Sequence, residues 1–293
     1  MFSIDRVFHL THLVDDHEAM LALYDEVFGA RMHWDRRTGP GGVTISLLLV
    51  GDLVVSPMTP GEGGAPAPQR FRERFGQHLH SIAWYVNDAA DMVEHLAPRG
   101  LALKDEYGRP LDGINHEIWT PARKTPTLVE FIDTSLGDIA GSDPRFAPDW
   151  STAYWREEQP LRIQGTACLT CVVEDLAAGT DFFAAGLHGE VIQEIARTPY
   201  GTRSVMVQVG PYTVVEVAEP VDAASRAAAD LAACGGDMLH ACTFLVADAT
   251  RAAEHLRSHG LRVEEPAPGH VVLDPADSQG TLFRFTDRQV ATW

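Results

Sequence analysis

Basic residues, cysteines and long apolar runs are all scarce in this chain of 293 residues. Lys and Arg total 23 against 41 Asp and Glu, which gives a formal charge of −18. This balance argues against nucleic acid and anionic membranes as partners, because both require clustered basic side chains. No apolar run approaches the ~20 residues that a membrane-spanning helix requires. The N-terminal stretch has an early Asp5 and no long apolar segment, so it does not predict a secretory signal. We therefore expect a cytoplasmic protein that contacts neither nucleic acid nor membrane.

The four cysteines and the glycine-rich segments form no strong cofactor motif. Cys168 and Cys171 have the spacing of half a zinc site, but they lie in a predicted strand, where residues three apart point to opposite faces. Buried core thiols are the favoured interpretation, and a metal or redox pair is the alternative. The sequence has no phosphate-binding loop, no dinucleotide fingerprint and no nucleophile elbow.

One pattern occurs four times and divides the chain into repeats. A β-rich strand leads to an Asp, then to a helix with apolar residues at helical spacing, and then to a Gly. The four copies are Val7–Gly29, Gln77–Gly100, Gly165–Gly189 and Asp237–Gly260. Three further short strands are predicted after each copy. The sequence therefore predicts four modules of order βαβββ.

The modules predict an α+β fold. A single module leaves a sheet edge exposed, so two modules are expected to form one cup-like, curved mixed sheet with helices outside. We predict an N-terminal domain at 1–137 from modules one and two, a connecting segment at 138–160, and a C-terminal domain at 161–293 from modules three and four. A pairing of module one with module four is the alternative.

Several segments carry expectations of their own. Met58–Gln69 is rich in Pro and Gly and is predicted to be a linker without ordered structure. Val221–Cys234 is rich in Ala and is predicted to be an extra helix or a linker. In the second module, a strand is expected near Leu101–Glu106.

Three segments resemble a known family: HLVDDHEAMLALYDEVFG, HSIAWYVND and PTLVEFID. They are similar to the vicinal oxygen chelate superfamily, which includes glyoxalases, bleomycin-resistance proteins and extradiol dioxygenases. The resemblance extends over essentially the whole chain as four modules. It implies the fold, whereas the reaction differs among members, which include ring-cleaving dioxygenases, epimerases and non-catalytic drug-binding proteins.

The resemblance also implies a metal site. Metal-dependent members use one His on the first strand of each paired module and a carboxylate on a last strand, which leaves open coordination positions for a substrate. His9 lies seven residues before the capping Asp and matches the first position. Glu130 lies in an apolar strand and matches the carboxylate, and such a Glu is costly unless it is paired or liganded.

The third ligand position is ambiguous. His80 lies eight residues before the capping Asp of module two, whereas the family spacing of seven falls on Ser81. Either a bulge or register change brings His80 inward, or Ser81 occupies the position, because neighbouring strand residues face opposite ways. Ser56 occupies a fourth family position, which favours a three-ligand site.

The second half departs from the family pattern. Its corresponding positions hold Cys168, Glu216, Ala241 (with His240 beside it) and Arg284. A cation at the position of the carboxylate opposes metal binding. We therefore predict that modules three and four are a degenerate half that supports the first.

Ring cleavage would also require an acid or base near the metal, and His116 and Tyr85 are the candidates. The resemblance thus favours a mononuclear metal-dependent enzyme similar to extradiol-type ring-cleaving dioxygenases. Its metal would be Fe(II), with Mn(II) or Zn(II) as alternatives, held by His9, His80 and Glu130. The substrate would be a small aromatic or oxygen-rich molecule, and a homodimer is a possible assembly.

Two alternatives remain open. One is a glyoxalase- or epimerase-like lyase or isomerase, and the other is a non-catalytic protein that binds a small molecule. The family's ring-cleavage signature is not reproduced before Glu130, and Ser56 and Ser81 favour the binding protein.

Overall fold

Each module begins with a strand that leads into an Asp-capped helix. A computed structural model describes residues 1–39, 42–61, 66–113, 116–135 and 139–289. The four capping residues are Asp16, Asp88, Asp175 and Asp248, and each carboxylate accepts a hydrogen bond from a backbone N–H in the first turn of its helix. These bonds satisfy donors that the start of a helix leaves unpaired. The repeated Asp of the sequence is therefore a helix-capping residue.

Modules one and two share a seven-stranded mixed sheet in the order β2-β3-β4-β1-β5-β7-β6. Module one comprises β1 (Ile4–Leu13), α1 (His17–Ala22), β2 (Arg31–Thr38), β3 (Thr44–Val50) and β4 (Leu53–Thr59). Helix α2 (Pro66–Phe75) leads to module two, which comprises β5 (His78–Val86), α3 (Ala89–Leu96), β6 (Glu117–Trp119) and β7 (Leu128–Asp133). A short helix, α4 (Ile139–Ser142), begins the connection to the second half.

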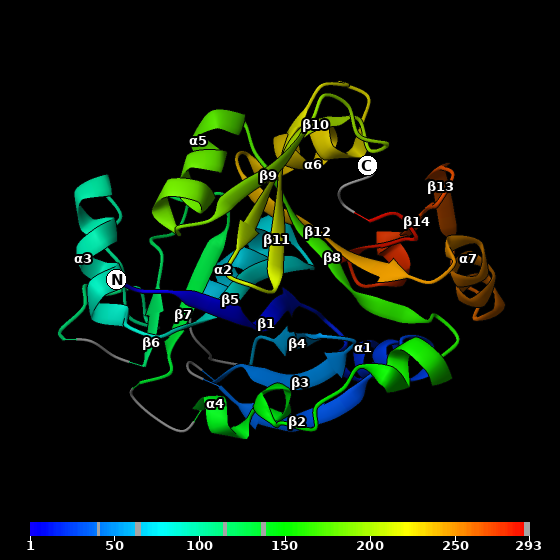
Figure 1. Cartoon of the computed structure of the whole chain (residues 1–293), viewed down its shortest axis with the longest axis horizontal. Coiled ribbons are helices and arrows are strands. Elements are labelled where there is room, and N and C mark those ends of the chain that lie inside the picture. The colour runs from blue at the N-terminus through cyan, green and yellow to red at the C-terminus, as the bar shows by residue number, and fades with distance from the viewer. Residues whose placement is uncertain (40–41, 62–65, 114–115, 136–138, 290–293) are drawn as a thin grey trace.

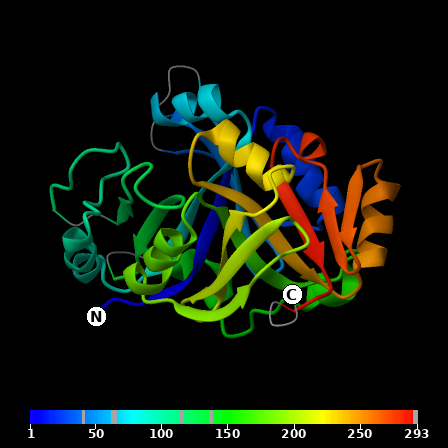
Figure 2. The same ribbon diagram turned by 90° about the horizontal axis from the view of Figure 1, so that it is seen from above.

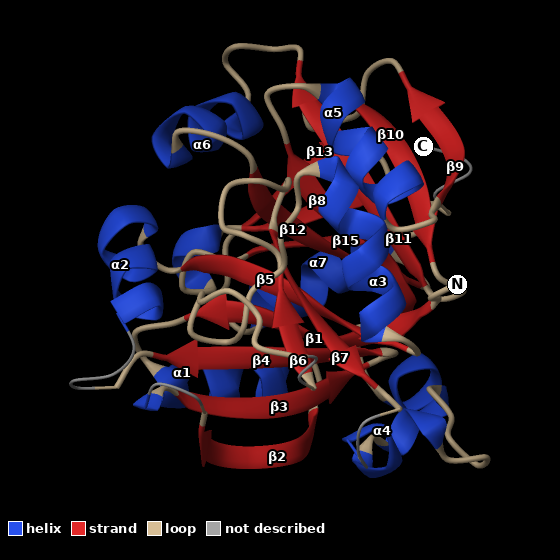
Figure 3. Cartoon of the chain, turned by 90° about the vertical axis from the view of Figure 1, so that its left-hand side faces the viewer, coloured by secondary structure: helices blue, strands red, loops and turns tan. Residues whose placement is uncertain are grey.

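Modules three and four form an eight-stranded sheet in the order β13-β14-β15-β12-β8-β11-β10-β9. Module three comprises β8 (Ile163–Val172), α5 (Leu176–Asp181), β9 (Glu190–Ile195), β10 (Thr202–Val209) and β11 (Thr213–Pro220). Helix α6 (Arg226–Cys234) leads to module four, which comprises β12 (Met238–Val246), α7 (Ala249–Ser258), β13 (Val263–Ala267), β14 (His270–Leu273) and β15 (Leu282–Thr286). Figure 1 shows the two sheets and Figure 3 the helices between and beside them.

The predicted α+β architecture is confirmed, since modules pair in sequence order into two mixed sheets. The first strands of paired modules are antiparallel neighbours, β1 with β5 and β8 with β12. The prediction of a strand near Leu101–Glu106 was wrong. Only Lys104 forms an isolated bridge there, to Pro110 and Trp119. The carboxylate of Asp105 accepts the backbone N–H groups of Tyr107 and Arg109, and this turn ends the pairing.

The two sheets meet through their helix-covered faces. Phe28, at the end of the first helical segment, packs edge-on against Phe244, Phe283 and Phe285 of the C-terminal sheet. Trp84 of β5 packs likewise against Phe183 of module three. These aromatic contacts pack the helical segments that follow α1 and α5 between the two halves.

The two inter-module helices lie next to each other on one side of the molecule. Figure 2 shows α2 in cyan beside α6 in yellow, and the two helices are in contact. The expectation that Met58–Gln69 lacks ordered structure was wrong at its ends, since β4 continues to Thr59 and α2 begins at Pro66; residues 62–65 lie outside the described part. The Ala-rich segment supplies α6. No helix among the described residues is long and apolar enough to span a membrane.

Candidate functional site

His9 and Glu130 meet on the face of the N-terminal sheet that is opposite its helices. His9 pairs with Ala83 of β5, and Ala83 in turn pairs with Glu130 of β7. Paired residues project to the same face, and β1 and β7 are two strand spacings apart, roughly 9.6 Å. The methyl group of Ala83 leaves the space between them free, so His9 Nε2 lies 3.3 Å from Glu130 Oε2. The structure thus brings together two of the three predicted metal ligands.

Strand β6 adds two polar side chains to this face. Trp119 pairs with Glu130, and Glu117 lies two residues earlier, on the same face. Burial raises the pKa of Glu117 to about 7, helped by the negative charges of Glu130 and Glu106. We call His9, Glu117, Trp119 and Glu130 the His9–Glu130 site.

Two polar atoms of this site have no hydrogen-bond partner among the described residues. They are His9 Nδ1 and Trp119 Nε1, and both are buried. Buried polar atoms are nearly always paired in folded proteins, because losing water without gaining a partner is costly. The site thus contains an indole donor and an imidazole nitrogen that no described protein group pairs.

His80 lies at a β-bulge. Thr11 pairs with Ser81 and His12 pairs with Leu79, so His80 has no partner across the strand pair. The bulge considered from the sequence spacing is therefore present, and bulges re-aim side chains near functional sites. The ring of His80 packs edge-on against Phe71 of α2, at 4.7 Å between centroids, and His80 Nδ1 lies 3.1 Å from Ser81 Oγ.

The three predicted ligands do not form one cluster. Burial, reinforced by the charges that His78 and His9 would carry, lowers the pKa of His80 to about 4, so its ring is neutral at pH 7. Among the residues described, no group of three or more His, Cys, Asp or Glu side chains is gathered closely enough to hold a metal ion. His9 and Glu130 would suit a metal as donors, whereas His80 would first have to leave Ser81 and Phe71. The three-ligand set therefore does not fit a metal in this arrangement.

The predicted acid/base residues have other surroundings. His116 precedes β6 with an exposed side chain. The Tyr85 hydroxyl donates to Asp143 Oδ2 at 3.2 Å, and Asp143 also pairs with the buried Arg145. Burial raises the pKa of Tyr85 well above its usual range.

Glu117 was not predicted from the sequence. The alternation of polar and apolar residues in HEIWT, with Glu117 next to a buried Ile, is the pattern of a half-buried strand and could have indicated it.

The C-terminal sheet carries a different polar arrangement. Glu216 accepts hydrogen bonds from Thr170, at 2.6 Å, and Ser204, at 2.7 Å. Arg284 lies 3.5 Å from the same carboxylate, and its other terminal nitrogen lies 3.3 Å from His240 Nδ1. Protein groups thus neutralise this carboxylate. The degenerate character of this half stays a prediction.

Three of the four cysteines are buried, whereas Cys234 is half-buried and lines a cavity. All four are free thiols, and Cys168 and Cys171 are buried. Burial raises the pKa of both thiols far above their usual range, which opposes the thiolate form that metal binding requires. Their positions agree with the interpretation of core thiols.

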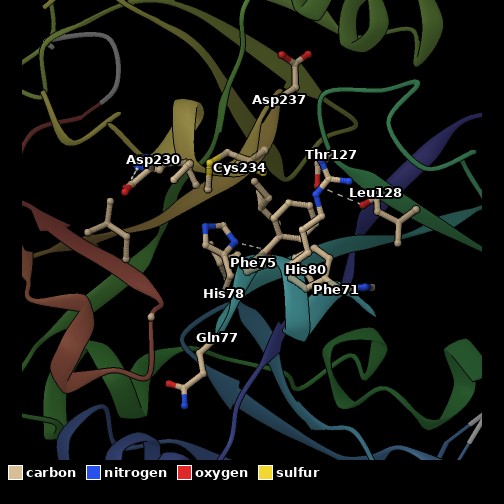
Figure 4. Close-up of a pocket in the computed structure, with 18 of the residues that line it drawn as sticks. Phe71, Phe75, Gln77, His78, His80, Thr127, Leu128, Asp230, Cys234 and Asp237 are labelled. Carbon is tan, nitrogen blue, oxygen red and sulfur yellow. Dashed lines mark hydrogen bonds and ion pairs between the residues drawn. The ribbon is translucent and has the colours of Figure 1, made fainter. Parts of the chain in front are cut away.

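A cavity of about 480 Å³ opens where the ends of β5, β7, β12 and β15 meet beneath α2 and α6. Figure 4 shows His78 and His80 pointing toward it from the N-terminal half and Asp230 from α6. His80 lines this cavity, and the charge that His9 would carry helps to lower the pKa of His80. The cavity therefore lies near the His9–Glu130 site.

Comparison with known proteins agrees with this architecture. Residues 6–118 match the family model of the Glyoxalase/Bleomycin resistance protein/Dioxygenase superfamily. This part of the chain is similar to the members of that superfamily. The resemblance predicted from the sequence is therefore confirmed. No curated protein matches the sequence.

Two solved structures share the fold of nearly the whole chain. A triple mutant of 4-hydroxymandelate synthase from Streptomyces coelicolor aligns with 97% of this chain and 92% of its own, at 12% identity and a TM-score of 0.65. The 2,3-dioxygenase LapB from Pseudomonas sp. KL28 covers the same shares, at 13% identity and a TM-score of 0.57. Methylmalonyl-CoA epimerase from Mycobacterium tuberculosis aligns with 45% of this chain and 93% of its own, at 20% identity and a TM-score of 0.40. At these identities, the first two likenesses establish a shared fold.

Proposed function

We propose that the His9–Glu130 site binds a small oxygen-containing molecule and transfers a proton on it, as an isomerase or lyase does. One observation carries the proposal. His9 Nε2 faces the Glu130 carboxylate at 3.3 Å, while His9 Nδ1 is buried without a partner among the described residues. The nearby carboxylate favours the ring proton on Nε2, which leaves the lone pair on Nδ1 free to act as a base.

Glu117 supplies the matching acid. With a pKa near 7, it retains its proton in an appreciable fraction of molecules at neutral pH. The group that holds a proton can act as the acid, and the group with a free lone pair can act as the base. Here the surroundings of each side chain assign these roles to Glu117 and His9. In this scheme, the substrate C–H proton moves to His9 Nδ1, and Glu117 donates a hydrogen bond to the oxygen on which charge develops. Return of the proton to a different carbon of the delocalised enolate completes an isomerisation, and no external oxidant or reductant is required.

The indole N–H of Trp119 would stabilise the same oxygen. It is a donor only, it is buried, and it has no acceptor among the described residues. A fixed donor of this kind is worth most where negative charge appears during the reaction, because little reorganisation is then required. Together with Glu117, it would provide two donors for one substrate oxygen.

Proton transfer can be tested before the substrate is identified. Purified protein is incubated in D₂O with a panel of small carbonyl compounds that bear an acidic α-hydrogen, and deuterium incorporation is followed by NMR. We expect exchange with the wild type and a loss of about 100-fold or more in His9→Gln. Glu94→Gln, an exposed substitution on α3, is the control. Exchange in His9→Gln at the wild-type rate would refute the role of His9.

A metal-dependent dioxygenase is the second candidate. It is supported by the full-length fold shared with 4-hydroxymandelate synthase and LapB, and by the contact between two of the predicted ligands. Fe(II) remains the favoured metal, and Mn(II) or Zn(II) the alternatives. This function requires His80 to turn away from Ser81. Metal analysis of the purified protein and oxygen uptake with a catechol panel after Fe(II) addition distinguish it from metal-free proton transfer. A protein that shows neither activity but binds small molecules would be the non-catalytic alternative.

A further inference from the structure

The cavity between the halves is formed by equivalent features of both sheets. His80 is the unpaired residue of a bulge in β5, and His240 is the unpaired residue of the corresponding bulge in β12, between Leu239 and Ala241. Both histidines line the same cavity of about 480 Å³. Bulges re-aim side chains, so the two halves direct equivalent imidazoles toward one space. Pockets of this size accommodate small ligands.

The cavity wall combines aromatic and aliphatic surface. Phe71 and Phe75 of α2 face it from one side, and Leu128, Leu239 and Leu282 line it from the sheets. Figure 4 shows the two Phe rings beside His80 and Leu128. Flat aromatic rings and branched aliphatic chains favour a planar apolar body, because such a ligand can pack against both.

Two guanidinium groups lie at one end of the cavity. Arg74 and Arg123 both pack on the ring of Phe75, at 5.1 and 5.3 Å from its centroid. Among the ion pairs of the described residues, neither has a carboxylate partner. Arg123 instead donates to the backbone carbonyls of Cys234 and Gly235 at the end of α6. Two adjacent cations without a counter-ion, in a chain of charge −18, favour an anionic group at this end.

An acidic side chain, Asp230, also lines the cavity. Asp230 lies 3.0 Å from His240 Nε2 and is one helical turn, roughly 6 Å, from Cys234 along α6. Burial lowers the pKa of His240 to about 4, although the contact with Asp230 opposes this change. The carboxylate would repel an anion but would accept a hydrogen bond from a hydroxyl or amino group. Arg226 and Asp237 also line the cavity, so both signs of charge are present, with Arg74 and Arg123 beside Phe75 and Asp230 beside His240.

We propose that this cavity is a second small-molecule site, distinct from the His9–Glu130 site, and that it takes an aromatic carboxylic acid with a hydrogen-bond donor on its ring. The carboxylate lies at Arg74 and Arg123, the ring packs between Phe71, Phe75 and the leucines, and the ring donor points to Asp230. Because the walls come from both halves, the bound acid also joins them.

The test uses the complete protein and 4-hydroxybenzoate as the probe, with binding measured by titration calorimetry. We expect saturable binding of 4-hydroxybenzoate, and affinity at least about tenfold lower for 4-hydroxybenzamide, which has no charge, and for cyclohexanecarboxylate, which has no aromatic ring. Equal affinity for the acid and the amide would overturn the charge argument. An absence of binding up to about 10 mM, well above a moderate Kd, would overturn the site.

Variants separate this site from the rest of the protein. Arg74→Gln should weaken binding of 4-hydroxybenzoate by about tenfold, whereas Arg70→Gln, exposed on the same helix, should leave it unchanged. Ala233→Trp places a large ring in the cavity from an exposed position of α6 and should abolish binding without loss of folding, which thermal unfolding checks. Retained affinity in a folded Ala233→Trp protein would refute the location. His9→Gln should bind the probe normally, so failure of the proton-transfer proposal leaves this test intact.

Discussion

Glu117 offers a quantitative test of the electrostatics of the His9–Glu130 site. Its pKa is raised from 4.5 to about 7 in the folded protein, mainly by burial and then by Glu130 and Glu106. Below pH 4.5, the folded and unfolded states both hold the proton, and the group costs nothing. Between pH 4.5 and 7, the folded state binds the proton more tightly, so stability falls as pH rises. Above pH 7, both states are ionised and the folded state bears the full cost.

The cost follows from the two pKa values. At 1.36 kcal/mol for each pKa unit, the difference between 4.5 and about 7 corresponds to ~3 kcal/mol as an upper limit. Glu117 is only partly shielded from water, and solvent screening reduces this value to ~1–2 kcal/mol. Glu117→Gln removes the charge and keeps the shape. We therefore expect the variant to be more stable than the wild type by ~1–2 kcal/mol at pH 8.5, and by much less at pH 5.

Urea unfolding at pH 5 and pH 8.5 measures this difference directly. Glu94→Gln, at an exposed position of α3, is the matched control and should change stability little at either pH. Carbon-13 NMR of the Glu117 carboxyl provides a second readout. The reasoning fails if Glu117→Gln has the same effect on the free energy of unfolding at both pH values, or if the carboxyl titrates near 4.5.

Three further substitutions test packing around the sites. Ala83→Leu fills the space through which the His9 imidazole contacts the Glu130 carboxylate. We expect the variant to lose deuterium exchange and to keep 4-hydroxybenzoate binding. Unchanged exchange would contradict the role of this contact. Arg284→Met leaves the buried Glu216 without its cation and should lower the free energy of unfolding by ~3–5 kcal/mol, measured in urea. Replacing Glu216 by Leu as well should recover most of this loss. A loss below about 1 kcal/mol would show that the pair is unimportant. Gly280→Ala adds a Cβ that meets the carbonyl oxygen of Gln77 at a φ of +79°, so we expect ~2 kcal/mol or more of destabilisation by the same assay, and wild-type stability would refute the close approach.

The repeat and its capping residues could be predicted from sequence because both are local. The Asp before each helix accepts a backbone N–H within the next three residues, so its role depends on no distant contact. The first strands of all four modules are apolar and largely buried, which periodicity predicts. The helix within the Pro-rich segment was missed, because Pro66 lies at its first position, where proline is tolerated.

The composition of the site could be predicted only in part. His9 was predicted from the family resemblance and Glu130 from the resemblance and its place in an apolar strand, but their contact depends on Ala83, which lies on a third strand between them. Glu117 was missed because its raised pKa depends first on burial and then on Glu130 and Glu106, and both follow from the tertiary structure. The orientation of His80 depends on a single extra residue in β5, and a shift of one residue reverses the face of every side chain.

Equivalent positions of the two halves show how one fold supports different chemistry. Glu130 and Arg284 occupy corresponding last strands, and each is buried. A buried charge must be compensated, and the two halves do this in opposite ways. In the C-terminal half, Glu216 accepts hydrogen bonds from two hydroxyl groups and lies beside the Arg284 cation, which compensates its charge. In the N-terminal half, the compensation is a single imidazole whose second nitrogen has no partner among the described residues. Arg284 Nε is also buried without a partner among the described residues, so the halves differ in the kind of free atom: a ring nitrogen at His9 and a cationic donor at Arg284. A free ring nitrogen can act as a base and a guanidinium cannot, and this difference favours the N-terminal sheet as the reactive one.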